Sequence, residues 1–217
     1  MPVECWLNLE SHYQEILARV AEEGQLERDL DWLNRIPINA MAKLNWLDKI
    51  KDKKAQLVEV LRFFGIANVD QWDEMWPKLN AAYRQNQSHE VFPETVSAWL
   101  RQGEIAASSI ACRPYNKTKF RDILDEIRGL TTEDPAHFVP VMQELCSMAG
   151  VAVVFVPALP KTGVSGATRW RNKDKATIQL SLRYKIDDHL WFTFFHEAGH
   201  ILLHGKKELF LEGTNGL

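Results

Sequence analysis

The stretch VAVVFV, at residues 151–156, decides the fold class of this chain of 217 residues. It is a continuous run of apolar, mostly β-branched residues, a pattern that favours a buried β-strand. Two further strands are predicted close behind it, in GATRW at 166–170 and in ATIQLSL at 176–182. The loop PALPKTGVSG, between the first two strands, contains two prolines and two glycines. We therefore predict a small sheet that begins near residue 151.

The chain before this sheet is predicted to be helical. Apolar residues recur at spacings of three and four from Cys5 to Val20, which indicates an amphipathic helix. Later segments begin with a capping residue or an early proline, and three of the four end at a glycine. These segments are 52–65, 92–107, 116–129 and 134–150. The fold class predicted from these patterns is α+β, with a helical region at 1–149 and a small α+β domain at 150–217.

Composition excludes several classes of protein. A formal net charge of -3 and a pI near 6.2 argue against a nucleic-acid module that binds through bulk positive charge. The three cysteines include no CxxC pair, so neither a disulfide framework nor a thiolate zinc site is predicted. The opening residues do not form a signal peptide, and VAVVFV is far too short to span a membrane. We expect a soluble protein of the cytoplasm.

The stretch FFHEAGHILLHG, at 194–205, carries the candidate chemistry. It lies in a helix predicted from Asp187 to His204, where His196, Glu197 and His200 are expected on a polar face opposite the apolar one. Residues four apart lie about one turn, roughly 6 Å, from each other, so both imidazoles can bind one cation. Neutral imidazole nitrogen suits Zn²⁺. Glu197 is then placed to act as a general base that takes a proton from the attacking water.

The HExxH spacing has competing interpretations. In a chain of this composition it arises by chance roughly two times in a hundred, and histidines that bind no metal are the alternative. His204 is a poor third ligand, because it lies about 12 Å along the helix from His196. We interpret it as a histidine at the helix C-terminus. Leu203 and Lys206 occupy the positions where a metzincin has glycine and histidine, which excludes that class.

The segment ATIQLSLRYKIDDHLWFTFFHEAGHILLHGKKELFLE, at 176–212, resembles the ImmA/IrrE family of metallopeptidases, and the resemblance extends from about residue 150. The family implies a zincin-like domain, Zn²⁺ held by His196 and His200, and Glu197 as the catalytic base. It also implies a third, acidic ligand on a following helix, in a motif resembling E-x-E-A-x-x-F-A. Because this chain ends in FLEGTNGL without such a motif, the third ligand is expected beyond Leu217.

The N-terminal stretch CWLNLESHYQEILAR, at 5–19, is similar to the last helix of an XRE-type helix-turn-helix module in HigA-like antitoxin regulators. Residues 22–149 resemble the helical linker of such proteins. The resemblance implies a zinc metallo-endopeptidase that acts on a repressor or antitoxin partner, with DNA bound only through a helix-turn-helix upstream of this chain. The alternative is a sensor or assembly domain of a transcriptional regulator that performs no catalysis. A third possibility is a truncated chain that lacks its third ligand and is inert.

Two weaker patterns remain open. The stretch SGATRW, at 165–170, either adds an extended peptide to the sheet or is a plain structural edge. Arg169, Arg171 and Lys173 form a short basic run, which is typical of a solvated face but would also steer an acidic substrate.

Overall fold

The computed structural model describes residues 13–15, 23–76, 92–181, 187–206 and 209–213. The chain divides into two compact units, Met1–Glu74 and Met75–Leu217. Helices and a mixed sheet are both present, which confirms the α+β class. Most of the helix predicted from Cys5 to Val20 lies outside the described residues. None of the described helices combines the length and hydrophobicity needed to cross a membrane.

The described secondary-structure elements of the first unit are all helices. Residues 23–29 are helical, and the elements that follow are η1 (Leu30–Asn34), α2 (Ile38–Lys43), α3 (Lys53–Phe64) and α4 (Val69–Met75). The side chain of Asp52 accepts a hydrogen bond from the Ala55 N–H and caps α3, and Gly65 ends α3 with a φ of 70°. Both signals were predicted from the sequence. Trp32 packs on Phe64 and Trp72 to form the core of this unit.

The second unit contains a sheet of four strands in the order β1, β3, β2, β4. Their bounds are β1 (Val151–Val156), β2 (Val164–Asn172), β3 (Lys175–Ser181) and β4 (Phe210–Gly213). Strand β1 is parallel to β3, and β2 is antiparallel to both β3 and β4. The three predicted strands are confirmed. Strand β4 was not predicted, because four residues are too few to show a period of two.

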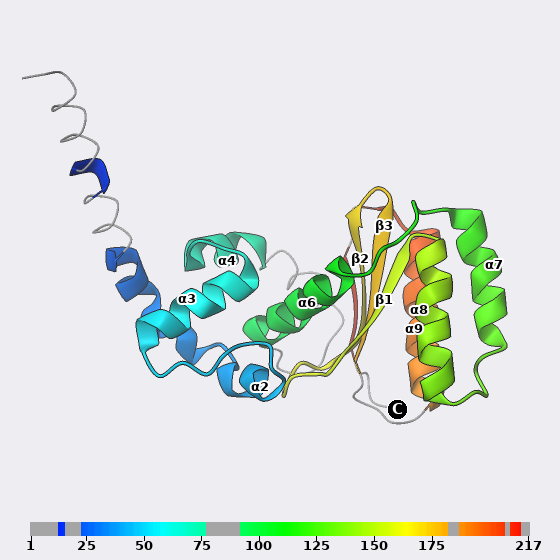
Figure 1. Ribbon diagram of the computed structural model, residues 1–217, viewed down its shortest axis with the longest axis horizontal. Coiled ribbons are helices and arrows are strands. Elements are labelled where there is room, and N and C mark those ends of the chain that lie inside the picture. The colour runs from blue at the N-terminus through cyan, green and yellow to red at the C-terminus, as the bar shows by residue number, and fades with distance from the viewer. Residues whose placement is uncertain (1–12, 16–22, 77–91, 182–186, 207–208, 214–217) are drawn as a thin grey trace, which may run out of the picture. The chain divides into compact units, whose positions relative to one another are not determined.

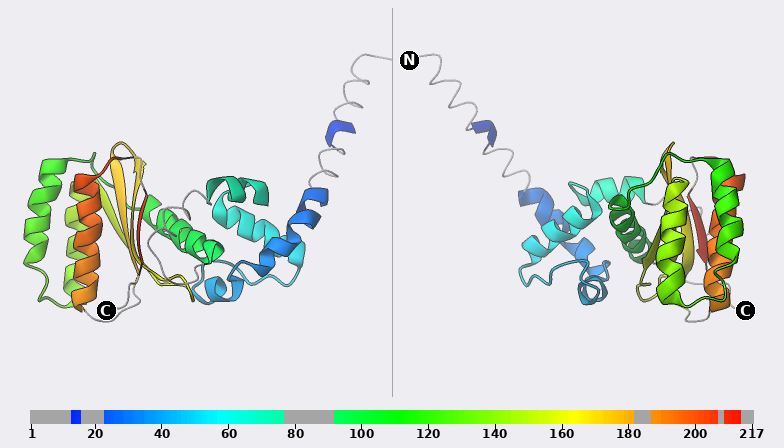
Figure 2. Two further views of the ribbon diagram at one scale, coloured as in Figure 1. Left: turned by 180° about the vertical axis from the view of Figure 1, so that it is seen from behind. Right: turned by 45° about the vertical axis from the view of Figure 1, so that its right-hand side comes forward.

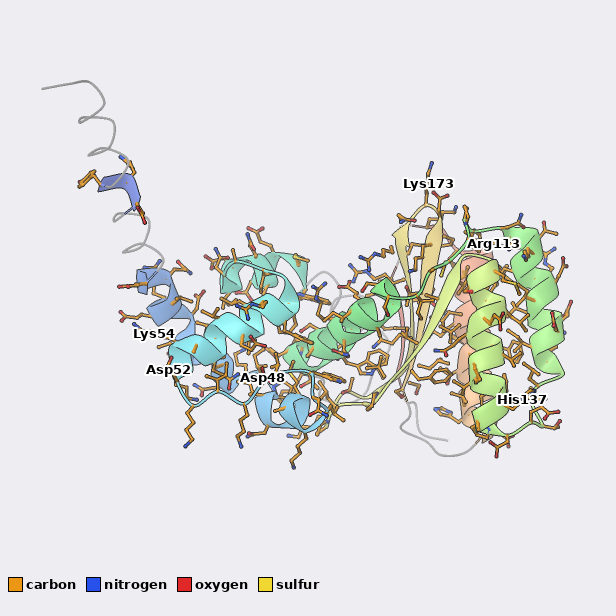
Figure 3. All side chains as sticks on the ribbon, in the orientation of Figure 1. Asp48, Asp52, Lys54, Arg113, His137 and Lys173 are labelled. Atoms are coloured by element: carbon orange, nitrogen blue, oxygen red, sulfur yellow. The ribbon has the colours of Figure 1, made fainter. Side chains whose placement is uncertain are left out.

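Strand β2 pairs along both of its edges. One edge bonds to β3, joined through a turn with Lys173 at the tip of the hairpin (Figure 3), and the other bonds to β4. The two interpretations of SGATRW, as an edge that adds a peptide strand and as a plain structural edge, are therefore both wrong for this arrangement, because β2 lies between β3 and β4.

Helices cover both faces of the sheet (Figures 1 and 2). Helices α8 (Pro135–Met148) and α9 (Asp187–Leu203) lie on one face, and α7 (Lys117–Arg128) packs outside them. Helix α6 (Pro93–Ser108) lies on the other face, where the Trp99 indole N–H donates to the Val156 carbonyl at 3.1 Å. The core beneath α8 and α9 contains Phe120, Phe138, Met142, Ile178, Leu180 and Phe194.

The sequence predicts a domain boundary after residue 149, whereas the two units of the structure meet between Glu74 and Met75. The sequence grouped α6, α7 and α8 with the N-terminal helices because all of them are helical. In the structure these three helices belong to the unit that contains the sheet, because their apolar faces pack on the strands or on helices that do so. Trp72, Trp76 and Trp99 are buried.

Gly150 joins α8 to β1 in a space that admits no side chain. Its φ is +85°, a left-handed conformation that disfavours L side chains. A Cβ atom placed there would lie 2.4 Å from the Tyr115 Cα. The segment before α7 crosses the end of α8 at this point, where the Asn116 N–H donates to the Ala149 carbonyl at 3.1 Å.

We predict that Gly150→Ala lowers the free energy of unfolding by at least about 2 kcal/mol, since it combines the cost of a left-handed alanine with backbone overlap. Urea unfolding followed by circular dichroism measures the change. The matched control is Gly199→Ala inside α9, where an added Cβ meets no atom within 4 Å. This control should raise stability by about 0.5–1 kcal/mol, because alanine is the better helix former. Equal effects of the two substitutions would contradict the prediction.

Candidate metal centre

Helix α9 lies close against strand β2, and this contact sets the orientation of the candidate site. A Cβ atom at Gly166 would lie 2.6 Å from the Thr193 Cγ2 and 2.8 Å from the Glu197 Oε1. The Thr168 hydroxyl donates to the Glu197 carbonyl oxygen at 3.0 Å. Glycine at 166 thus admits the helix, and Thr168 fixes its position. Thr193 and Glu197 face the sheet as a result.

His196 and His200 converge as the sequence predicts for a metal-binding pair. Their Nε2 atoms lie 3.0 Å apart, while His196 is exposed and His200 half-buried. Two imidazoles bound to one tetrahedral Zn²⁺ at about 2.05 Å each hold their nitrogens about 3.3 Å apart. The rings need to separate by only a few tenths of an ångström to accept the ion. The pair therefore fits a divalent metal.

The surroundings of His200 keep its imidazole neutral. Burial first, and then the neighbouring His196 and His204, lower the pKa of His200 from 6.5 to about 4. Neutral imidazole is the form that binds metal, so protons compete for this ring only in acid. Phe210 of β4 stacks on the ring with a centroid distance of 4.1 Å and an angle of 12°. Among the described residues the buried Nδ1 has no hydrogen-bond partner, so the ring is oriented by this stacking and by the contact of its Nε2 atom with the His196 Nε2 atom at 3.0 Å.

Glu197 does not share the polar face predicted for it. Its side chain has 0% exposure and lies against Gly166 of β2. The prediction that Glu197 and the two histidines are segregated on one polar face is therefore wrong. The prediction assigned the Glu197 carboxylate to the solvent because it is polar. The absence of a side chain at Gly166 leaves room for this carboxylate between α9 and the sheet. A general base must reach a water molecule, so burial is the feature against which its catalytic role has to be tested.

Among the residues that the structure describes, no third metal ligand lies beside the pair. In the described parts of the chain, no group of three His, Cys, Asp or Glu side chains is suited to hold a metal. His204 follows the end of α9 and is exposed, and its backbone N–H bonds to the His200 carbonyl at 3.1 Å. Glu208 lies outside the described residues, as does the side chain of Glu212.

Three residues that shape this centre were not identified from the sequence. They are Gly166 and Thr168, which position α9, and Phe210, which stacks on His200. A glycine within a strand pattern signals the close approach of another element, so Gly166 carried a usable signal. The role of Phe210 depends on the pairing of β4 with β2, which no local pattern reveals.

No family model matches this chain, and comparisons with the curated proteins and with the solved structures find no match either. The resemblance to the ImmA/IrrE family therefore remains a prediction, and the function has to be argued from the arrangement of the residues.

We predict that the chain binds one zinc ion, and that His196→Gln or His200→Gln weakens binding by a factor on the order of 100, because each removes one of the converging nitrogens. Competition with a chromogenic chelator measures the affinity. The control is His204→Gln, a histidine in the same stretch whose loss should change affinity less than about threefold. A comparable loss in all three variants would show that the two Nε2 atoms do not define the site.

Proposed function

We propose that this chain is a zinc metallopeptidase domain that hydrolyses peptide bonds. The observation that carries the proposal is the convergence of the His196 and His200 Nε2 atoms to 3.0 Å on one turn of α9, with Glu197 adjacent in the chain. His196 and His200 would hold Zn²⁺. The zincin-like character of the fold belongs to the same proposal.

Bound zinc supplies Lewis acidity, which polarises a scissile carbonyl and makes water a stronger acid. The remaining work falls to the residues of the chain. Glu197 would take the proton of the attacking water and return it to the leaving amine. Gly166 and Thr168 hold the backbone of α9 at this residue, so they position the carboxylate relative to the two imidazoles. The proposal requires water to enter beside Glu197 when a substrate binds.

The proposed substrate follows from the resemblance to ImmA/IrrE peptidases. It is a protein partner of the repressor or antitoxin type. Contact with DNA is proposed only through a helix-turn-helix upstream of this chain.

The burial of Glu197 favours a second candidate function. A carboxylate with 0% exposure beside Gly166 and Thr193 is placed like a packing residue of the helix-sheet contact. In this alternative the two histidines bind metal for structure or sensing, and the domain mediates assembly of a transcriptional regulator without cleaving anything.

Glu197→Gln separates the two functions. If the chain is a peptidase, the variant should keep its zinc but lose at least about a thousandfold in kcat/KM, because the amide cannot accept the proton. Zinc content is measured by atomic absorption, and cleavage is followed by mass spectrometry of a peptide library incubated with the zinc-loaded protein. His204→Gln serves as the control that keeps both properties.

Two results would oppose the peptidase proposal. One is a zinc-loaded wild-type protein that cleaves no peptide of the library, which favours the sensor or assembly function. The other is a Glu197→Gln variant that cleaves as fast as the wild type, which removes Glu197 from the reaction.

A further inference from the structure

A cavity of about 180 Å³ lies between helix α6 and strands β2 and β3. Helix α6 lies on the face of the sheet opposite α9 (Figure 1). Charged groups come from both sides: Arg101 and Glu104 from α6, and Arg169 and Arg171 from β2. The apolar part of the wall includes Leu100, Ala107 and Ala167. The candidate metal centre lies on the other side of the sheet, so the cavity is a separate site.

The alternation of side chains along β2 places the arginines here. Gly166 and Thr168 face α9, so Ala167, Arg169 and Arg171 face α6. The sequence predicted a solvated face or a steering role for this basic run. Arg171 is exposed, but Arg169 is half-buried and paired with a residue of α6, so the run is only partly solvated.

The described residues that line the cavity include more positively than negatively charged side chains. Arg101 pairs with the Glu104 Oε2 at 2.9 Å, and Arg169 pairs with the Oε1 of the same carboxylate. The Arg171 Nη1 donates to the Glu104 backbone carbonyl at 3.5 Å, which engages no further negative charge. The described residues that line the cavity thus carry three positive charges against one negative charge.

Burial lowers the pKa values of two of these arginines. Burial, followed by the charges of Arg101 and Arg171, lowers the pKa of Arg169. Burial also lowers the pKa of Arg101. Positive charge in a partly desolvated place is costly, and an anion bound beside these guanidinium groups would offset the cost.

We infer that this cavity binds a phosphoryl group, either as inorganic phosphate or as the phosphate of a small monoester. Guanidinium groups approach from a helix and from two positions of a strand, and donors from several directions suit a tetrahedral oxyanion. A planar carboxylate pairs with fewer guanidinium groups than a tetrahedral phosphate does: the Glu104 carboxylate pairs with two, Arg101 and Arg169. The cavity has room for a phosphate and is smaller than the roughly 300–1,000 Å³ of pockets for drug-sized ligands. An organic substituent would extend toward solvent past the exposed Arg171.

Isothermal titration calorimetry with inorganic phosphate tests the inference, using the whole chain at low salt with a chelator present to exclude phosphate bound through a metal. Arg171→Gln and Arg169→Gln should each weaken binding about tenfold. The matched control is Arg121→Gln, which removes the same charge from an exposed position on α7 and should leave the affinity within about twofold. Circular dichroism verifies that each variant is folded. Absence of binding by the wild type, or an equal loss in the Arg121 variant, would overturn the inference.

A second variant tests the role of Glu104. Glu104→Gln removes the only negative charge among the described lining residues, so phosphate should bind several-fold more tightly. Weaker binding by a folded variant would contradict this site. Glycerol phosphate and acetate, titrated in parallel, distinguish the ligands. Tighter binding of glycerol phosphate than of inorganic phosphate identifies the ligand as a phosphate ester, and the reverse identifies it as the free ion. Acetate that binds as tightly as phosphate would overturn the phosphoryl assignment.

Discussion

The contact between helix α9 and strand β2 is the constraint on which the second unit depends. Gly166 lacks the Cβ atom that would collide with Thr193 and Glu197, and the Thr168 hydroxyl bonds to the Glu197 backbone. Because these contacts fix the rotation of the helix about its axis, they also determine where His196 and His200 point. The geometry of the candidate metal centre is thus set by residues that would never touch a metal.

Local signals in the sequence predicted the elements of the fold well. Asp52 and Gly65 bound α3, Asn116 caps α7, and the three segments predicted as strands after residue 150 are strands. These features depend on interactions between residues a few positions apart, such as caps and the period of side chains. The His196 and His200 pair was predictable for the same reason, because one helical turn brings the two rings together whatever surrounds them.

Features that depend on distant residues were not predictable in this way. The burial of Glu197 requires a glycine thirty-one positions earlier in the chain, and the stacking of Phe210 on His200 requires the pairing of β4 with β2. The grouping of α6, α7 and α8 with the sheet is likewise a matter of packing rather than of local pattern. Glu197 also shows how polarity misleads: the helical wheel assigns a carboxylate to the solvent, but a gap left by a missing side chain can hold it.

The alternation of side chains along β2 restricts how this domain can evolve. Its even-numbered residues Gly166 and Thr168 serve the helix, whereas Arg169 and Arg171 serve the opposite face. Inserting or deleting one residue between Thr168 and Arg169 would turn the two arginines toward the face that α9 covers. Changes of chain length are therefore tolerable only outside the strand, in segments such as 157–163, and homologous chains should align through β2 without gaps.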